Sequence, residues 1–262
     1  SKSSEDPLSR RIITPNLKTV NFQMVKNATP DGILLVDKPS GMTSHDVVDA
    51  VRKRFRIKKV GHCGTLDPNA TGLLILVLGK ATKLSEKLMG EDKVYTGIIE
   101  LGRETNSYDI DGETVAEKDI PDLSTERLNE FTQAFKGDQM QIPPMVSAIK
   151  RNGVPLYKLA RKGIEVERPP RLIHIYYFRI KTYQRPECEF EVACTKGTYV
   201  RSLAQDLGQN IGCGAHLKTL RRTVSGNFKI QAAIPLDDIL ACDMGSLMAS
   251  LLPPSLADAA RP

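Results

Sequence analysis

Apolar residues follow two spacing patterns along this chain, continuous short runs and helical spacing. Ile33 to Val36 and Leu73 to Leu78 are short continuous apolar runs, and runs of this length predict buried strands. Between them, apolar side chains recur at helical spacing up to Phe55, and Thr43 or Ser44 is a suitable cap, which predicts a helix. Further strands are predicted at Lys93–Leu101, Leu172–Tyr183 and Glu187–Thr195, and further helices at Ala81–Met89, Ser124–Phe135, Leu156–Lys162, Thr198–Asn210, Ile234–Ala241 and Met244–Leu252.

Strands that alternate with helices, with hairpin-like runs in the middle, predict a mixed α+β domain. We expect this domain to span residues 31–230, between a polar N-terminal tail (1–30) and a short helical extension (231–262). A long irregular excursion is predicted at Gln141–Gly153, which contains Pro143, Pro144 and the turn from Lys150 to Gly153. Long loops in compact domains are often functional, so this segment is a candidate for contact with a ligand.

The chain has 262 residues, of which 40% are apolar, so it can bury a core and wholesale disorder is not expected. Basic residues number 37 against 31 acidic ones, which gives a net charge of +6. This balance is compatible with a polyanionic partner without proving one. Clustering is the stronger signal, although most charge runs are simply solvated faces. One cluster runs from Arg52 to Lys59, and a second contains Lys218, Arg221 and Arg222.

The 5 cysteines are odd in number and include no Cys-x-x-Cys pair. With no signal peptide and no apolar run of membrane length, this pattern favours a reducing, cytoplasmic setting over a disulfide framework. Cys213 and His216 lie close together, but their spacing does not match that of paired zinc ligands, so we expect no metal site. No coiled-coil or repeat pattern demands assembly, and we expect a monomer.

The stretch from Gly61 to Gly72 carries the most specific chemical signal. It holds one carboxylate, Asp67, in a glycine-punctuated loop beside His62 and before the second apolar run. Glycines allow tight turns and close approach of a ligand, and Pro68 biases Asp67 away from helix. An acid fixed in a loop on a rigid scaffold is a plausible chemical site. An Asp before Pro is also typical of a residue that only closes a turn, so the loop alone leaves both interpretations open.

This loop resembles the catalytic loop of the TruB family of pseudouridine synthases. Four further segments resemble other motifs of that family and occur in the family order. The run from Lys38 to Gly41 resembles its Lys-Pro-x-Gly motif, and Lys93 to Tyr95 resembles its aromatic motif. Gly197 to Arg201 and Leu220 to Thr223 resemble its later motifs. One such segment is weak evidence, whereas five in order identify the chain as a member of the family.

The resemblance implies the pseudouridine synthase fold, with a mixed, largely antiparallel central sheet, flanking helices and a catalytic cleft in residues 31–230. It implies isomerisation of the T-loop uridine of tRNA (position 55) to pseudouridine, without cofactor or metal, on a base flipped out of the RNA. Asp67 is then the nucleophile, and Arg201 keeps its carboxylate ionised. Tyr95 is expected to stack on the uracil, although a strand tyrosine alone is more typical of a core. Whether Asp67 attacks the ribose, attacks the base or removes a sugar proton stays open.

The same resemblance implies RNA contacts around the cleft. His62 is expected to insert into the RNA stack and help the target base leave. Lys38 is expected to support the pocket or to contact a phosphate. A mobile segment at about 136–168, which contains the irregular excursion, is expected to close over the RNA. Leu220 is expected at the pocket wall, and Arg221 and Arg222 at backbone phosphates. Tyr199 either lines the same wall or packs behind Arg201.

Two other functions are compatible with these residues. Some members of the family act in a ribonucleoprotein and take their target in ribosomal RNA from a guide RNA. They carry an additional C-terminal RNA-binding domain, the PUA domain, and residues 231–262 are too few to form one. The other alternative is an RNA-binding chaperone for tRNA folding in which catalysis is secondary. Intact Asp67, Tyr95 and Arg201 argue against a protein that has lost catalysis.

Overall fold

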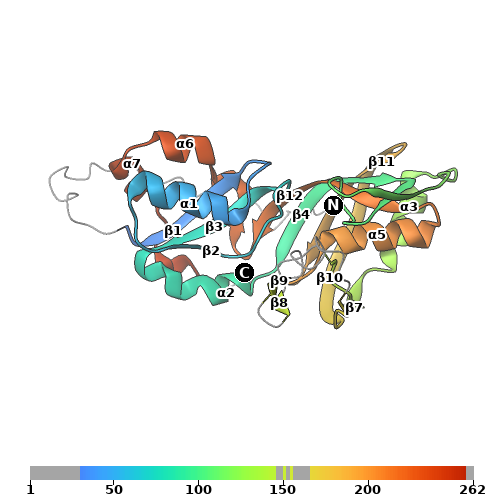
Figure 1. The fold of residues 1–262 in the computed structure, drawn as a ribbon, viewed down its shortest axis with the longest axis horizontal. Helices are drawn as coiled ribbons and strands as arrows, with labels where there is room; N and C mark the ends of the chain where they lie inside the picture. Colours follow the sequence, from blue (N-terminus) through green and yellow to red (C-terminus); the bar gives the residue numbers. More distant parts are fainter. Residues whose placement is uncertain (1–29, 146–149, 152–153, 156–165, 258–262) are drawn as a thin grey trace, which may run out of the picture.

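The fold is built on one long sheet in which strands from distant parts of the sequence lie side by side (Figure 1). A computed structural model describes residues 30–145, 150–151, 154–155 and 166–257. Neighbouring strands of this sheet run antiparallel except for two parallel pairs among the described residues, β1 with β14 and β3 with β12. In pairing order the strands are β14 (Ile234–Pro235), β1 (Gly32–Lys38), β3 (Thr71–Leu78), β12 (Ala215–Ser225), β4 (Lys93–Leu101), β11 (Glu187–Cys194), β10 (Arg171–Gln184) and β7 (Gly137–Gln141), with β2 (Val60–His62) beside β3 and β13 (Phe228–Lys229) beside β12.

Helices cover both halves of this sheet, and β12 with β4 joins the halves (Figure 1). Two small hairpins form separate two-stranded sheets. They are β5 (Arg103–Thr105) with β6 (Thr114–Glu117), and β8 (Lys150–Arg151) with β9 (Val154–Pro155). The predicted α+β class with a largely antiparallel central sheet is confirmed. The helices are α1 (Ser44–Phe55), η2 (Gly79–Leu84), α2 (Ser85–Met89), α3 (Thr125–Gln133), α5 (Val200–Ile211), η3 (Ile230–Ala232), α6 (Leu236–Ala241), α7 (Met244–Ser250) and η4 (Pro254–Ala257).

Strands β1 and β3 are continuous apolar runs because both faces of the sheet are covered here. Leu34 and Val36 of β1 face the larger core, which includes side chains of α1, α5 and α6. Ile33 and Leu35 face a second, smaller core on the opposite side, with Leu88 of α2. Since successive side chains of a strand point to opposite faces, two cores require apolar residues at every position. The sheet is therefore rigid where β3 leaves the Asp67 loop.

Local capping explains where α1 begins. The Thr43 hydroxyl accepts a hydrogen bond from the Asp46 amide at 3.0 Å, and the Asp46 carboxylate accepts one from the Thr43 amide at 2.9 Å. This reciprocal pair is a capping box. The helix ends at Arg56, which adopts a left-handed conformation with φ of 53°. The predicted helix is confirmed, as is the helix predicted from Ser124, whose hydroxyl accepts from the Arg127 amide.

One predicted element differs from the observed structure, and one observed strand was not predicted. The helix predicted at Ala81–Met89 is a 3-10 turn followed by one short α-helix. No strand was predicted around Leu217, yet this segment belongs to the central strand β12. Its polar side chains hide the strand pattern, because several of them pair inside the protein. The helix predicted at Leu156–Lys162 lies outside the described residues.

Gly97 is expected to be irreplaceable in the sheet. It lies opposite Leu220 in the pairing of β4 with β12, and a Cβ at this position would be 2.1 Å from the Thr219 carbonyl oxygen. Since that oxygen is backbone, the strands would have to separate. We expect Gly97→Ala to lower the free energy of unfolding by at least about 3 kcal/mol in urea denaturation. Gly245→Ala in α7 is the control, because its nearest atom is 3.5 Å away, and it should be neutral or stabilise by up to about 1 kcal/mol. Equal stability of the two variants would contradict this packing argument.

Candidate active site

The loop between β2 and β3 carries Asp67 and is tied down on several sides. The Ser44 hydroxyl, at the start of α1, accepts from the Leu66 amide at 2.8 Å and donates to the Leu66 carbonyl at 3.2 Å. On the other side of Asp67, the Pro68 carbonyl accepts from the Gly41 amide at 2.9 Å and from Lys38 Nζ at 3.0 Å. The backbone on both sides of the acid is therefore held, so the side chain is presented in one orientation.

Strand β12 brings the later segments of the chain to this loop. It runs parallel to the start of β3, with Arg222 opposite Gly72, and antiparallel to β4, with Arg222 opposite Tyr95. Register shifts interrupt the β12–β4 pairing on either side of this segment. Gly72 has φ of 98°, and a Cβ there would be 2.4 Å from the Arg222 carbonyl oxygen. Only glycine permits this approach of the two strands beside the site.

Asp67 is paired with Arg201, which enters from the first turn of α5. Arg201 Nε lies 2.9 Å from Asp67 Oδ2, and Nη2 donates to Oδ1 at 3.3 Å, so the guanidinium faces both carboxylate oxygens. The Arg201 side chain is 4% exposed, whereas that of Asp67 is 43% exposed. The acid therefore remains accessible while its partner is buried. The turn-closing interpretation also holds for the backbone, because the Ala70 amide donates to the Asp67 carbonyl at 3.0 Å.

A second carboxylate shares the same arginine. Arg201 Nη1 lies 3.4 Å from Asp109 Oδ2 and donates to the Ser107 carbonyl at 3.2 Å. The Ser107 hydroxyl in turn donates to Asp109 Oδ1 at 2.5 Å. Burial raises the pKa of Asp109, although Ser107 and Arg201 oppose this effect. Asp109 therefore holds the Arg201 guanidinium on the side away from Asp67, so that its other donors face Asp67. The sequence analysis did not predict this role for Asp109. The acidic residues Asp109 and Asp111, in the polar stretch after β5, were the signal in the sequence that could have found it.

Tyr95 lies on β4 beside the loop and is 9% exposed. Burial raises the pKa of its phenol, and Arg222 opposes this both by its charge and by a side-chain hydrogen bond to the hydroxyl. Arg222 is 1% exposed. Its Nε donates to the Leu73 carbonyl at 2.7 Å and its Nη2 to the Gly64 carbonyl at 3.1 Å. One buried guanidinium therefore joins the tyrosine, the Asp67 loop and β3.

A cavity of about 610 Å³ opens over these groups. Six of the nine predicted site residues line it together, although they come from four separate segments of the chain. Its wall also includes Lys93, which was not predicted as a site residue, and apolar side chains at the mouth such as Leu172. The predicted residues that line the cavity are Asp67, Tyr95, Tyr199, Arg201, Leu220 and Arg222.

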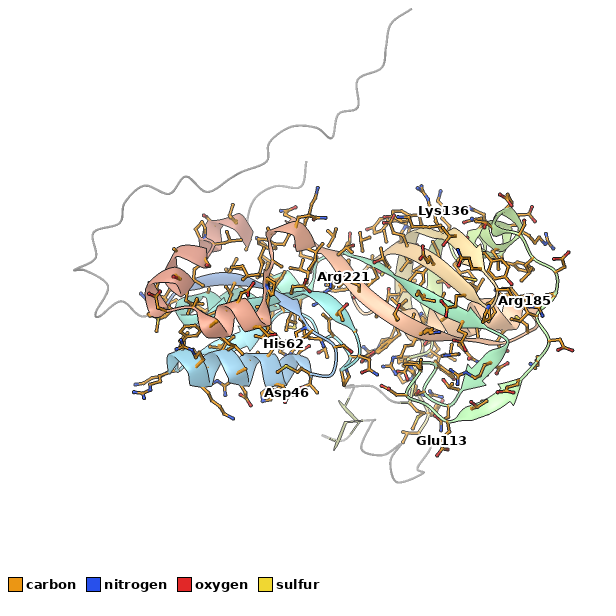
Figure 2. All side chains as sticks on the ribbon, turned by 90° about the horizontal axis from the view of Figure 1, so that it is seen from above. Asp46, His62, Glu113, Lys136, Arg185 and Arg221 are labelled. Carbon is orange, nitrogen blue, oxygen red and sulfur yellow. The ribbon has the colours of Figure 1, made fainter. Side chains whose placement is uncertain are left out.

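The other three predicted residues lie beside the cavity. His62 ends β2 and is partly buried, and burial lowers its pKa. Arg221 holds Asp37 through two contacts, Nη1 to Oδ1 at 3.0 Å and Nη2 to Oδ2 at 2.6 Å. Figure 2 places His62 and Arg221 on the half of the molecule that contains α1. Lys38 is fully buried, and its ammonium donates to the carbonyls of Pro39, Met42 and Pro68.

The burial of Lys38 is expected to make the stability of the protein depend on pH. Burial lowers its pKa to about 8 from the ordinary 10.5, against the opposing charge of Asp67. Between these values the unfolded chain binds more protons than the folded protein, so the lysine increasingly favours folding as pH rises. We expect the stability of the wild type relative to Lys38→Met to rise by up to about 3 kcal/mol between about pH 7 and about pH 10. Urea unfolding at both pH values measures it, and a difference that is constant or falls with pH would contradict it.

The basic clusters are placed differently from what their sequence position suggested. Helix α1 starts at the Asp67 loop and runs away from it for 12 residues, or about 18 Å, so the cluster that begins at Arg52 lies at its far end. At that end Arg54 donates to the carbonyls of Leu240 and Cys242. In the second cluster, Lys218 pairs with Glu100 at 3.1 Å and with Glu187. Much of this basic charge therefore has partners within the protein.

Metal ligation finds no support among the residues that the structure describes. No group of three or more histidine, cysteine or acidic side chains within it could hold a metal ion. His216 is engaged by Arg103, with Nη2 2.9 Å from Nε2 and the Arg103 carbonyl 3.1 Å from Nδ1. In the same part of the chain, the helices are too short or too polar to cross a membrane.

Comparison with known proteins is consistent with this geometry. Residues 52–200 match the N-terminal domain of TruB family pseudouridylate synthases, and residues 201–255 match the C-terminal domain of tRNA pseudouridylate synthase B. The tRNA pseudouridine synthase B of Opitutus terrae is 51% identical over 223 residues, which cover 85% of this chain and 92% of that protein. The protein of the same name from Geotalea uraniireducens is 52% identical over 208 residues, which cover 79% and 67%.

Among solved structures, one chain of a Cbf5–Nop10–Gar1 complex superposes with a TM-score of 0.70 at 28% identity. The match covers 89% of this chain but only 63% of the other. The sheet presents an arginine-paired aspartate to the cavity, and the matched proteins are pseudouridine synthases. Together these observations define the class of protein as a pseudouridine synthase, an isomerase. A family model matches residues 52–200, and the two relatives share 51% and 52% of their aligned residues with this chain. These matches narrow the class to one family. The chain belongs to the TruB family.

Proposed function

We propose that this protein isomerises uridine 55 in the T-loop of tRNA to pseudouridine, without a cofactor, with Asp67 as the nucleophile. Its relatives from Opitutus terrae and Geotalea uraniireducens are named as tRNA pseudouridine synthases, which supports tRNA as the substrate. Isomerisation exchanges a carbon–nitrogen bond for a carbon–carbon bond within one nucleotide, so no redox partner or donor group is consumed. The protein acts in the cytoplasm as a single chain, a setting consistent with its free cysteines.

The observation that carries the proposal is the asymmetric burial of the Asp67–Arg201 pair. A nucleophilic carboxylate has to stay ionised while substrate displaces water, and a guanidinium facing both oxygens favours the ionised form. Because the arginine is buried and the acid is half-exposed, only the acid is open to a substrate. An ordinary surface ion pair would leave both groups exposed and would contribute little.

The cavity walls suit a base that has left its helix. Tyr95 offers a ring for stacking on the uracil, and Tyr199 and Leu220 complete the wall. His62, beside the loop, fills the space that the base vacates in the RNA stack. Since Arg222 is almost fully buried, we propose that it acts on the base within the cavity rather than on a backbone phosphate. Lys38 and Arg221 support the RNA site by holding Pro68 and Asp37, and the exposed edge of Arg221 remains available to a phosphate.

A guide-dependent function is the second candidate, because the Cbf5 chain is so similar in fold. The solved neighbours include an H/ACA ribonucleoprotein bound to a substrate RNA, matched at 26% identity. The tRNA synthases are about twice as similar in sequence, which favours direct recognition of tRNA. A tRNA-folding chaperone that has lost catalysis would have no need of an accessible Asp67 held by a buried Arg201, so the site argues for catalysis.

A short transcript of the T-stem and loop discriminates among these functions. The purified protein is incubated with the transcript alone, and pseudouridine is measured by nuclease digestion and mass spectrometry. Modification of the loop uridine without guide RNA is expected, and none in a transcript that carries cytidine at that position. Binding without modification would favour the chaperone, and modification only with a guide RNA would favour the ribonucleoprotein function.

A further inference from the structure

Two buried cations line the cavity beside Tyr95 without an acidic partner of their own. Lys93 is 5% exposed and Arg222 is 1% exposed. The Lys93 ammonium donates to the Met89 carbonyl at 2.8 Å and to the Glu91 carbonyl, while Arg222 donates to the Leu73 and Gly64 carbonyls. Among the described residues, neither forms an ion pair with a carboxylate, unlike Arg201. Charges this deeply buried are normally paired.

The two cations converge on one point at the cavity floor. A Cβ placed on Gly64, in the Asp67 loop, would lie 3.3 Å from Arg222 Nη1 and 3.9 Å from Lys93 Cε. Lys93 and Tyr95 are two positions apart on β4 and so project from the same face of the sheet. Burial, and after it the charge of Arg222, lowers the pKa of Lys93 to about 8, against the opposing effect of the nearby Cys194, Asp92 and Glu91. The floor thus holds positive charge that, among the described residues, no carboxylate neutralises by direct contact.

We propose that Lys93 and Arg222 form a cationic floor that stabilises the uracil anion after it separates from the ribose. The inference rests on the proposed function. When Asp67 attacks the ribose, its oxygen bonds to C1′, the C1′–N1 bond breaks, and the electron pair leaves with the uracil. The negative charge spreads over N1, O2 and O4. C5 of the turned base then attacks C1′, the Asp67 carboxylate is released, and the proton on C5 passes through water to N1.

The position of the charges suits this step better than it suits binding of neutral uridine. Fixed charges in a dry cavity act most strongly where charge develops in the transition state. Asp67 and Arg201 neutralise each other at one side of the cavity, so they offer little field to a departing anion. The floor provides that field and holds a detached base that no covalent bond retains. Tyr95, which lies opposite Arg222 in the pairing of β4 with β12, offers its ring for stacking beside this floor.

The test compares two leaving groups. A T-stem-loop carrying 5-fluorouridine at the target position releases a more acidic base, which needs less stabilisation. Loss of intact uridine or 5-fluorouridine is followed at mildly acidic pH with protein in excess, by nuclease digestion and mass spectrometry. In Lys93→Met, uridine cleavage is expected to slow by at least about tenfold more than 5-fluorouridine cleavage. A purely structural Lys93 would slow both by the same factor, which would overturn the proposal.

Matched variants keep the result interpretable. Lys196→Met removes an exposed lysine at the cavity mouth, and its ratio of the two rates should equal that of the wild type. A thermal melt tests whether Lys93→Met folds. If it does not, the ratio of the two rates is measured with Lys93→Gln, whose neutral amide can still donate to a carbonyl. A wild type that cleaves neither substrate would refute the proposed function as well. A wild type that cleaves both, with an unchanged ratio in the variant, would refute only the cationic floor.

Discussion

Asp67→Asn is expected to lower the rate of pseudouridine formation by at least about 10⁴-fold, the largest effect of any single substitution here. An amide has the shape of the carboxylate but is a far poorer nucleophile. Asparagine can still accept a hydrogen bond from Arg201, so the loop should keep its structure. Single-turnover assays on a T-stem-loop measure the rate, and filter binding measures the affinity. RNA affinity should change by no more than a few-fold, because most of it comes from phosphates and stacked bases.

Two features allow residual activity of Asp67→Asn to be interpreted directly. Asparagine in proteins can revert to aspartate through attack by the following backbone nitrogen, but residue 68 is proline, which carries no N–H. Residual activity would therefore not come from deamidation. Asp119→Asn, at an exposed position before α3, is the matched control and should turn over like the wild type. An Asp67→Asn protein that forms pseudouridine at the normal rate would remove Asp67 from its assigned role.

Local sequence signals predicted the parts of the fold that depend on neighbours in the chain. The capping box at Thr43 and the two-faced apolar strands β1 and β3 are of this kind. The central position of β12 was not predictable in this way. Its Leu220-Arg221-Arg222 segment has the composition of a solvated basic cluster, and its burial depends on the Leu73 and Gly64 carbonyls far away in the sequence. A charged strand becomes a core strand only when the fold provides its partners.

The same distinction applies to the site. A family pattern could pair Asp67 with Arg201, since both stand in motifs that occur in order along the chain. It could not show that Arg201 divides its donors between Asp67 and Asp109, because this depends on how the polar turn after β5 folds against α5. Nor could composition separate the exposed cluster at the far end of α1 from Lys93, whose environment is set by backbone carbonyls. Charge count alone carries no information on burial.

Replacing Arg201 should damage both catalysis and stability, and for different reasons. Arg201→Met removes the cation that faces Asp67, so the rate of isomerisation is expected to fall by about 10²–10³-fold. It also leaves Asp109, whose side chain is only 20% exposed, without its ion-pair partner. An uncompensated buried charge typically destabilises by about 3–5 kcal/mol, and the free energy of unfolding in urea should fall by that order. Arg127→Met, at an exposed position on α3, is the matched control and should change neither quantity.

The double variant Arg201→Met with Asp109→Asn separates the two effects. Removing the stranded charge of Asp109 should restore a large part of the lost stability, because a neutral amide can keep the hydrogen bond from Ser107. It should restore none of the activity, because Asp67 still lacks its guanidinium. Stability and rate would then move apart in the same pair of proteins. A double variant no more stable than Arg201→Met would show that Asp109 does not depend on the arginine, and recovery of rate with stability would show that Arg201 acts only as part of the scaffold.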